Sequence, residues 1–206
     1  MIKRTMGLSL LGLLVISGLA GRMTNHSLTK PERKKALTMM KETRSEFLEK
    51  INDLSPRQLS FRPAEGKKTI RDYVFHLALT EKKLWEMLEK GMNTPYSSSR
   101  KAEVELNDES LICLVEDRSG NGSGYDPYLD IRNKYKTYKE ALEDFKDQRI
   151  KHIRYLRTST ADLRNHVVNF PFGTIDCYQL CLLIAAHTER HLKDIEAIMD
   201  DPSYPE

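Results

Sequence analysis

Four segments of the 206-residue chain place apolar side chains at helical spacing among charged ones, and this pattern restricts the fold more than any other feature. They cover about residues 31–53, 69–91, 135–158 and 175–199. Charged residues make up 31% of the chain and aromatic residues only 8%, which favours helices over a β-sandwich or a barrel. The length suits one domain with a sizeable core. We therefore predict an all-α domain that folds as a four-helix bundle.

The connection between the second and third segments, residues 93–133, is unusually long. It shows no sustained periodicity and contains a Ser-Ser-Ser run and a Gly-Asn-Gly-Ser-Gly run. Bundle helices are usually joined by a few residues, whereas this connection has about 40. We predict a long crossover that lets the second and third helices run parallel. The other connections are expected to be a turn at residues 54–59, an irregular stretch at 61–66 and a loop that ends at 171–173.

The N-terminus has the three-part layout of a secretory signal. A basic start precedes an apolar run from Met6 to Ala20, with a cleavage site after Ala20. This run of about 15 residues is shorter than the roughly 20 that a membrane-spanning helix needs, which disfavours a retained anchor. We expect a signal peptide at residues 1–20 and a mature domain at residues 25–206. The expected location is extracytoplasmic, periplasmic or secreted, with an N-terminal membrane anchor as the alternative.

The charge balance excludes one class of partner. The chain has 33 Lys and Arg against 30 Asp and Glu, and removal of a leader with Lys3 and Arg4 would leave 31 against 30. Nucleic-acid-binding proteins need a clear basic excess to replace phosphate counterions, so we exclude nucleic acid. We expect a small-molecule substrate of unknown identity and membrane contact only if the N-terminal segment is retained. Association as a homodimer is left open.

The three cysteines indicate neither a disulfide framework nor a zinc knuckle. Cys113, Cys177 and Cys181 are odd in number and lack the Cys-x-x-Cys spacing. Cys177 and Cys181 lie one turn apart on one predicted helix, where small buried side chains are the favoured interpretation.

Two histidines lie one turn apart on the apolar stripe of the segment at 175–199. His187 and His191 fall on the same face as neighbouring Leu and Ile residues, so both are expected to face the core. A pair at this spacing can chelate one Zn²⁺ or Ni²⁺ ion. The segment reads His-Thr-Glu-Arg-His, so it is not the zincin motif, which begins His-Glu.

The segment at 69–91 adds His76 on the flank of its apolar stripe and Glu81 in the middle of it. A carboxylate buried among aliphatic side chains costs several kcal/mol unless it is paired, so Glu81 requires a cation or a hydrogen-bonding partner. It could orient a ligating imidazole, hold a water molecule or act as a base. We expect a divalent metal on His76, His187 and His191, with Glu81 beside it.

Other interpretations of the histidines stay open. His152, at the edge of the stripe in residues 135–158, is a rival ligand, whereas His26 and His166 are expected in loops or at the surface. A histidine on an apolar face is often only a packed and satisfied core residue. The three candidate ligands could therefore serve packing alone.

Several stretches together resemble the DinB-like superfamily, the damage-inducible-protein-like metal-binding bundles. Residues 170–179 and 185–191, Phe-Pro-Phe-Gly-Thr-Ile-Asp-Cys-Tyr-Gln and Ala-Ala-His-Thr-Glu-Arg-His, resemble its last helix. Residues 59–63 and 70–76, Leu-Ser-Phe-Arg-Pro and Ile-Arg-Asp-Tyr-Val-Phe-His, resemble its second helix and the approach to it.

The resemblance implies a four-helix bundle with a long crossover between its second and third helices. It also implies that the family's three metal-binding histidines fall on His76, His187 and His191. Members of known activity are thiol-dependent transferases and isomerases. This sequence departs from the family's usual pattern at two places: the usual Trp-Ser is Lys68-Thr69 here, and the Gln common after the last histidine is Asp194. These departures bear on the identity of the substrate more than on metal binding.

These observations lead to two functional hypotheses. A three-histidine site leaves a coordination position open for water or a thiolate, which suits a metal-dependent hydrolase or thiol transferase with Glu81 assisting. Low-molecular-weight thiols are chiefly cytoplasmic, so thiol transfer fits an exported chain less well. The alternative is a non-catalytic extracytoplasmic bundle that binds a metal or another ligand.

Overall fold

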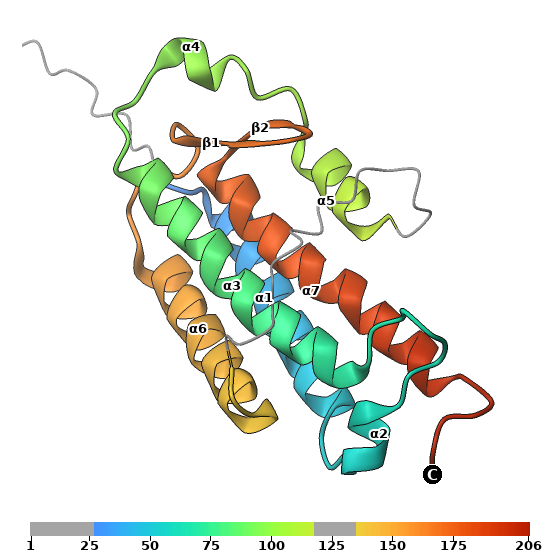
Figure 1. Ribbon diagram of the computed structural model, residues 1–206. Coiled ribbons are helices and arrows are strands. Elements are labelled where there is room, and N and C mark those ends of the chain that lie inside the picture. The colour runs from blue at the N-terminus through green and yellow to red at the C-terminus, as the bar shows by residue number, and fades with distance from the viewer. Residues whose placement is uncertain (1–26, 118–134) are drawn as a thin grey trace, which may run out of the picture.

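Four long helices form the bundle in the computed structural model, which describes residues 27–117 and 135–206. They are α1 (Lys30–Lys50), α3 (Ile70–Met92), α6 (Tyr138–Thr158) and α7 (Cys177–Met199) (Figure 1). Each lies within a few residues of a segment predicted from its periodicity. The predicted all-α four-helix bundle is therefore confirmed.

Local sequence fixes where the helices begin. In each capping box a side chain before the helix accepts from a backbone N–H three residues on, and the side chain there accepts a bond in return. Such boxes begin α1, α3, α7 and the short helix α2 (Pro56–Ser60), which takes the place of the turn predicted at 54–59. The pairs are Thr29 with Glu32, Ser55 with Gln58, Thr69 with Asp72, and Asp176 with Gln179.

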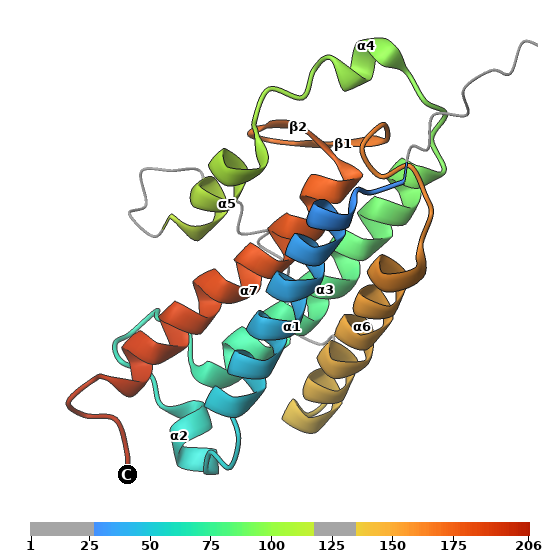
Figure 2. The same cartoon turned by 180° about the vertical axis from the view of Figure 1, so that it is seen from behind.

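The long helices are ordered around the core so that α3 contacts α6 and α7, and α1 contacts the same two helices. The colours in Figures 1 and 2 show that α3 and α6 run in the same direction, opposite to α1 and α7. Since α3 ends near one end of the bundle and α6 begins at the other, the chain must cross its full length between them. The predicted crossover and its parallel pair of helices are confirmed.

The crossover is more structured than its irregular sequence indicated. It contains α4 (Ser98–Lys101) and α5 (Asp108–Glu116), each begun by a polar side chain that accepts from the backbone, Ser97 and Asn107. Leu111 and Val115, one turn apart on α5, are buried where this helix packs on α7. The sequence shows no sustained periodicity in this segment because its two helices are too short to produce one. The Gly-rich run at 120–124 lies outside the described residues.

A two-stranded antiparallel hairpin replaces the loop predicted before the last helix. Its strands are β1 (Val167–Phe170) and β2 (Gly173–Asp176), with Phe170 opposite Gly173. The hairpin lies close to α3 at Gly91, where a Cβ atom would stand 2.7 Å from Cγ1 of Val168. Only glycine allows this close approach of helix and strand.

The first half of α7 forms the centre of the core. Every residue from Cys177 to Thr188 is buried, because α1, α3, α5 and the hairpin surround this part of the helix. The predicted stripe covered only one face of it. Cys177 and Cys181 are buried and unpaired, as expected for packing residues, and burial raises the pKa of both thiols. Cys113 is exposed.

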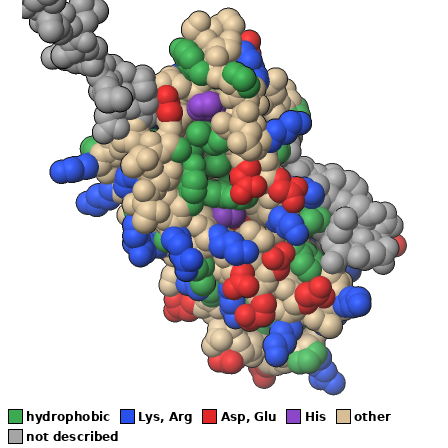
Figure 3. All heavy atoms as spheres, turned by 90° about the vertical axis from the view of Figure 1, so that its left-hand side faces the viewer, with side chains coloured by type: hydrophobic (Ala, Val, Ile, Leu, Met, Phe, Trp, Pro, Cys, Tyr) green, Lys and Arg blue, Asp and Glu red, His purple; other side chains and the backbone are tan. Residues whose placement is uncertain are grey.

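The outer surface agrees with the near-neutral composition. In Figure 3, acidic and basic side chains are mixed over one flank of the bundle, and a strip of hydrophobic side chains lies between two histidines.

Among the described residues, no helix is long and apolar enough to cross a membrane. The signal segment predicted at residues 1–20 lies outside the described residues, so cleavage and export stay predictions.

Candidate metal centre

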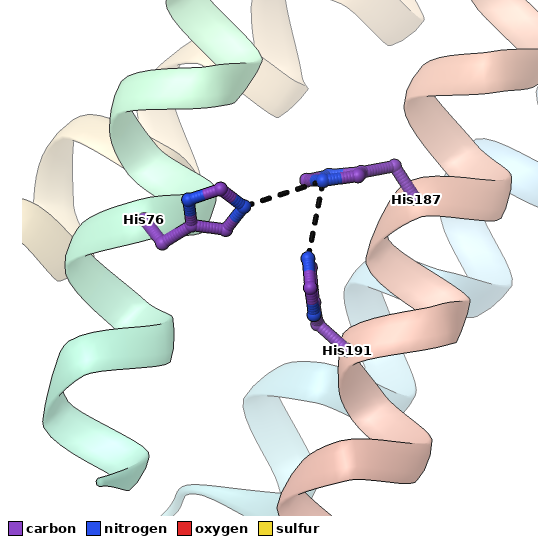
Figure 4. Close-up of side chains that lie close together, drawn as sticks. All are labelled: His76, His187 and His191. Atoms are coloured by element: carbon purple, nitrogen blue, oxygen red, sulfur yellow. Dashed lines mark hydrogen bonds between the residues drawn. The ribbon is translucent and has the colours of Figure 1, made fainter. Parts of the chain in front are cut away.

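Three buried histidines from two neighbouring helices meet inside the bundle (Figure 4). His76 comes from α3, and His187 and His191 come from successive turns of α7. Nε2 of His187 lies 3.3 Å from Nε2 of His76 and 3.1 Å from Nε2 of His191. The three side chains are only 1–2% exposed. The structure thus brings together the three residues that sequence and resemblance selected.

The protons and lone pairs available on these ring nitrogens favour a cation at the centre of the cluster. A ring nitrogen of neutral imidazole carries either one proton or one in-plane lone pair, so Nε2 of His187 cannot serve both neighbouring nitrogens well. Nδ1 of His191 lies 2.9 Å from Oδ2 of Asp194, and an ionised carboxylate only accepts. Nδ1 therefore carries the proton, and Nε2 of His191 presents a lone pair to the cluster.

The spacing of the nitrogens also fits a metal ion. Ligand nitrogens of one tetrahedral zinc ion, each roughly 2.0–2.1 Å from the metal, lie about 3.3 Å apart. The two short Nε2 separations match this value, and all three ligand atoms lie within 4.8 Å of one another. The donor set therefore suits one divalent ion and leaves room in its coordination sphere for a further ligand.

Both departures from the family pattern lie beside this cluster. Asp194 contacts His191 directly. Lys68 lies over the ring of Tyr73, with its Nζ 5.4 Å from the ring centroid, and the Tyr73 ring is 5.2 Å from that of His191. The two changes therefore alter the rim and the support of the site and leave its three nitrogens in place.

We expect Asp194→Ala to weaken metal binding about 10- to 100-fold, because the carboxylate fixes the tautomer and orientation of His191. Competition with a chromophoric chelator measures the affinity. Glu189→Ala is the matched control, since Glu189 lies on the same helix and pairs with Lys193. An Asp194→Ala protein with wild-type affinity would show that His191 is held without this contact.

Glu81 does have the cationic partner that its predicted burial required. Arg149 on α6 donates from Nε to Oε1 and from Nη2 to Oε2, both at 2.7 Å. Nδ1 of His152 lies 2.7 Å from the same Oε1. His152, which the sequence left as a rival ligand, is therefore a partner of Glu81 and does not belong to the histidine cluster. Its ring stacks on Trp85 at 3.8 Å.

Arg149 connects this carboxylate to the other helices. Its Nη1 donates to the carbonyl of Met40 at 3.1 Å and to Oγ1 of Thr43 at 2.9 Å, both on α1. Its Nη2 also donates to Oγ1 of Thr188 at 2.7 Å, and Thr188 is the residue next to His187. One guanidinium group thus ties all four long helices together within one residue of a candidate metal ligand.

The network keeps Glu81 ionised. Burial by itself would raise the pKa of the carboxyl, but the charge of Arg149 and the hydrogen bond from His152 outweigh it and lower the pKa to about 2. At neutral pH the group is a fixed anion bound to a fixed cation.

The remaining histidines lie apart from the cluster. His166 follows α6 on the way to the hairpin, and its Nδ1 is 3.0 Å from the carbonyl oxygen of Thr94. This agrees with the prediction of a loop position. His26 lies outside the described residues.

Comparison with known proteins agrees with the fold described above. Residues 39–195 match the model of the DinB superfamily. YfiT from Bacillus subtilis, described as a probable metal-dependent hydrolase with an unusual four-helix bundle topology, has a similar structure. The TM-score is 0.58 at 16% sequence identity, over 87% of this chain and 92% of YfiT. No curated protein matches the chain in sequence.

Proposed function

The chain belongs to the DinB superfamily, and we propose that it is an exported metal-dependent hydrolase with one zinc ion on His76, His187 and His191. The observation that carries this proposal is the convergence of three buried histidines, in which Nε2 of His187 lies at the separation expected between ligands of a tetrahedral ion from Nε2 of both His76 and His191. The description of YfiT as a probable metal-dependent hydrolase supports the reaction class.

The ligands favour an electrophilic metal. Three neutral imidazoles leave the double positive charge of the ion undiminished, so it supplies Lewis acidity to a bound carbonyl or phosphoryl group. The chain's own residues hold that geometry: Asp194 fixes His191, and the contact from Arg149 to Thr188 fixes the turn of α7 beside His187. Hydrolysis is preferred to thiol transfer because the leader-like N-terminus indicates a compartment poor in low-molecular-weight thiols.

We assign Glu81 the supporting role among those expected from the sequence. A general base works best when its pKa lies near the working pH, and the pKa of this carboxyl is about 2. Both of its oxygens are already bound by Arg149 and His152. Glu81 therefore contributes by fixing the helices that carry the ligands.

Metal removal tests the proposal. The protein, purified with its metal, is assayed against a panel of esters, amides and phosphoesters before and after dialysis with a chelator, and again after addition of Zn²⁺, Ni²⁺ or Mn²⁺. We expect hydrolysis of at least one substrate class to fall more than tenfold and to recover with Zn²⁺. Turnover that survives complete removal of the metal would exclude the mechanism, and a full-length protein that stays in the cytoplasmic fraction would exclude export.

The burial of the histidines favours a second candidate, a bundle that binds metal without catalysis. Side chains that are 1–2% exposed offer a substrate little access in this conformation. In that case the protein retains one ion per chain, metal raises its melting temperature, and no member of the substrate panel is hydrolysed.

A further inference from the structure

A groove between α1 and α6 is lined by positively charged side chains that take no part in the metal centre. It has a volume of about 340 Å³, within the range of small-molecule sites. Two of its lining residues, Lys41 and Arg44, come from α1, and Arg154 and Arg157 come from α6. The two helices contact each other and can be followed in Figure 2. Four cations and no acidic side chain line this groove.

These cations lack the acidic partners that many other basic side chains have. Within the described part of the chain, none of the four forms an ion pair, whereas Lys35, Lys50 and Lys193 pair with Glu109, Glu196 and Glu116. Nε of Arg44 is buried and has no hydrogen-bond partner among the described residues. A buried donor without an acceptor costs free energy, which an anionic group in the groove would recover.

The rest of the lining is apolar. Ile150 and Ile153, close together on α6, complete the groove. Ile150 is 43% exposed and is one of only two large hydrophobic side chains that the described residues leave exposed. A ligand that covered it would remove apolar area from water.

We propose that this groove binds a small amphiphilic anion, with a phosphate or carboxylate head among the four cations and a short alkyl tail on Ile150 and Ile153. The head would accept from Arg44 and Arg154, which reach the groove from opposite helices. Because the groove shares no residue with the histidine cluster, this site is independent of the proposed hydrolase activity.

Calorimetric titration with decyl phosphate, kept below the concentration at which it forms micelles, tests the site on the full chain. We expect decyl phosphate to bind more tightly than inorganic phosphate or the neutral amphiphile decyl maltoside. Arg44→Gln/Arg154→Gln should weaken its binding at least about tenfold, because two charge-assisted contacts are lost. Ile150→Ser should weaken binding of decyl phosphate severalfold and leave inorganic phosphate unchanged.

The control removes the same charge elsewhere. Arg57→Gln/Lys82→Gln removes two exposed cations, on α2 and α3, that form no ion pair with another described residue, and it should change the affinity less than twofold. Thermal melts establish that each variant is folded. Anionic lipid vesicles are titrated as a further probe. The proposal is overturned if the two double variants lose the same affinity for decyl phosphate, or if the wild type binds decyl phosphate no more tightly than decyl maltoside or phosphate. It is also overturned if the protein binds only to the anionic vesicles.

Discussion

His187→Ala is expected to abolish stoichiometric metal binding. His187 is the central member of the cluster, since its Nε2 is within 3.3 Å of the corresponding atoms of both His76 and His191. Loss of this imidazole leaves two nitrogens on different helices and removes the pair at one-turn spacing that can chelate an ion. We expect about one ion per chain in the wild type, and less than a tenth of that in the variant after the same purification.

Two measurements separate loss of metal from loss of fold. Elemental analysis gives the metal content. Thermal unfolding with and without Zn²⁺ gives the stabilisation by the metal, because an ion that binds only the folded state stabilises it by about 2.7 kcal/mol when its free concentration is 100 times its Kd. The wild type should show this shift and His187→Ala should not.

His166→Gln is the control for the loss of a histidine, because Nδ1 of His166 lies against the backbone carbonyls of Gly91 and Thr94 and the residue lies outside the cluster. It should keep the full metal content. A His187→Ala protein that retained one ion per chain would move the metal away from this cluster, and a wild type that could not be loaded with any divalent ion would leave the histidines as packing residues.

The histidine cluster could be predicted from the sequence because each helix contributes a local pattern. The one-turn spacing of His187 and His191 fixes their common face, and the capping pair of Thr69 with Asp72 fixes the start of the helix that carries His76. The packing of these two helices against each other is a tertiary contact that periodicity does not predict, and it was inferred from the family resemblance. Export and the identity of the metal are not properties of this geometry.

Arg149 was missed for a physical reason, and His152 was considered only as a rival metal ligand and not as a partner of Glu81. A charged residue on a helix is ordinarily solvated, so the predicted buried face of this helix was defined by apolar residues such as Phe145 and Leu156. The polar residues between them were left out of it. In the structure both polar residues face the core, opposite Glu81. The signal that would have found Arg149 was Glu81 itself, because a buried anion predicts a buried cation on a neighbouring helix.

The hairpin and the short helices were missed because their stability comes from contacts outside the segment. β1 has four residues and depends on packing against α3 at Gly91. α5 is held on α7, and Gln179 of α7 also donates to the carbonyl of Leu106 just before it. Arg164 joins the same region through Glu32 and Asp108. Such pieces carry little periodicity of their own.

Arg149→Met should destabilise the protein by about 3–5 kcal/mol, because it leaves the carboxylate of Glu81 buried without its cation. The substitution also removes donors to the carbonyl of Met40 and to Thr43 and Thr188. Urea unfolding at neutral pH measures the change. Lys151→Met is the control on the same helix, and as an exposed side chain it should change the free energy of unfolding by less than about 0.5 kcal/mol.

The same network predicts a particular acid sensitivity. Glu81 has a folded-state pKa of about 2 against an ordinary value of 4.5, so its contribution of about 3 kcal/mol is fully present above pH 4.5 and is lost as the pH falls toward 2. The free energy of unfolding of the wild type should therefore fall through this window. In Glu81→Gln this component is absent, so its stability should change less steeply over the same range.

The double variant Glu81→Leu/Arg149→Met distinguishes an ion pair from a general packing defect. If the cost of Arg149→Met comes from an uncompensated buried anion, removal of that anion should recover more than half of the lost stability, although the cavity is filled imperfectly. If the two substitutions add, the network acts through shape alone. Metal content in the double variant then tests the link to the site: because Thr188 loses its donor from α6, we expect the ion to bind more weakly even where stability is recovered.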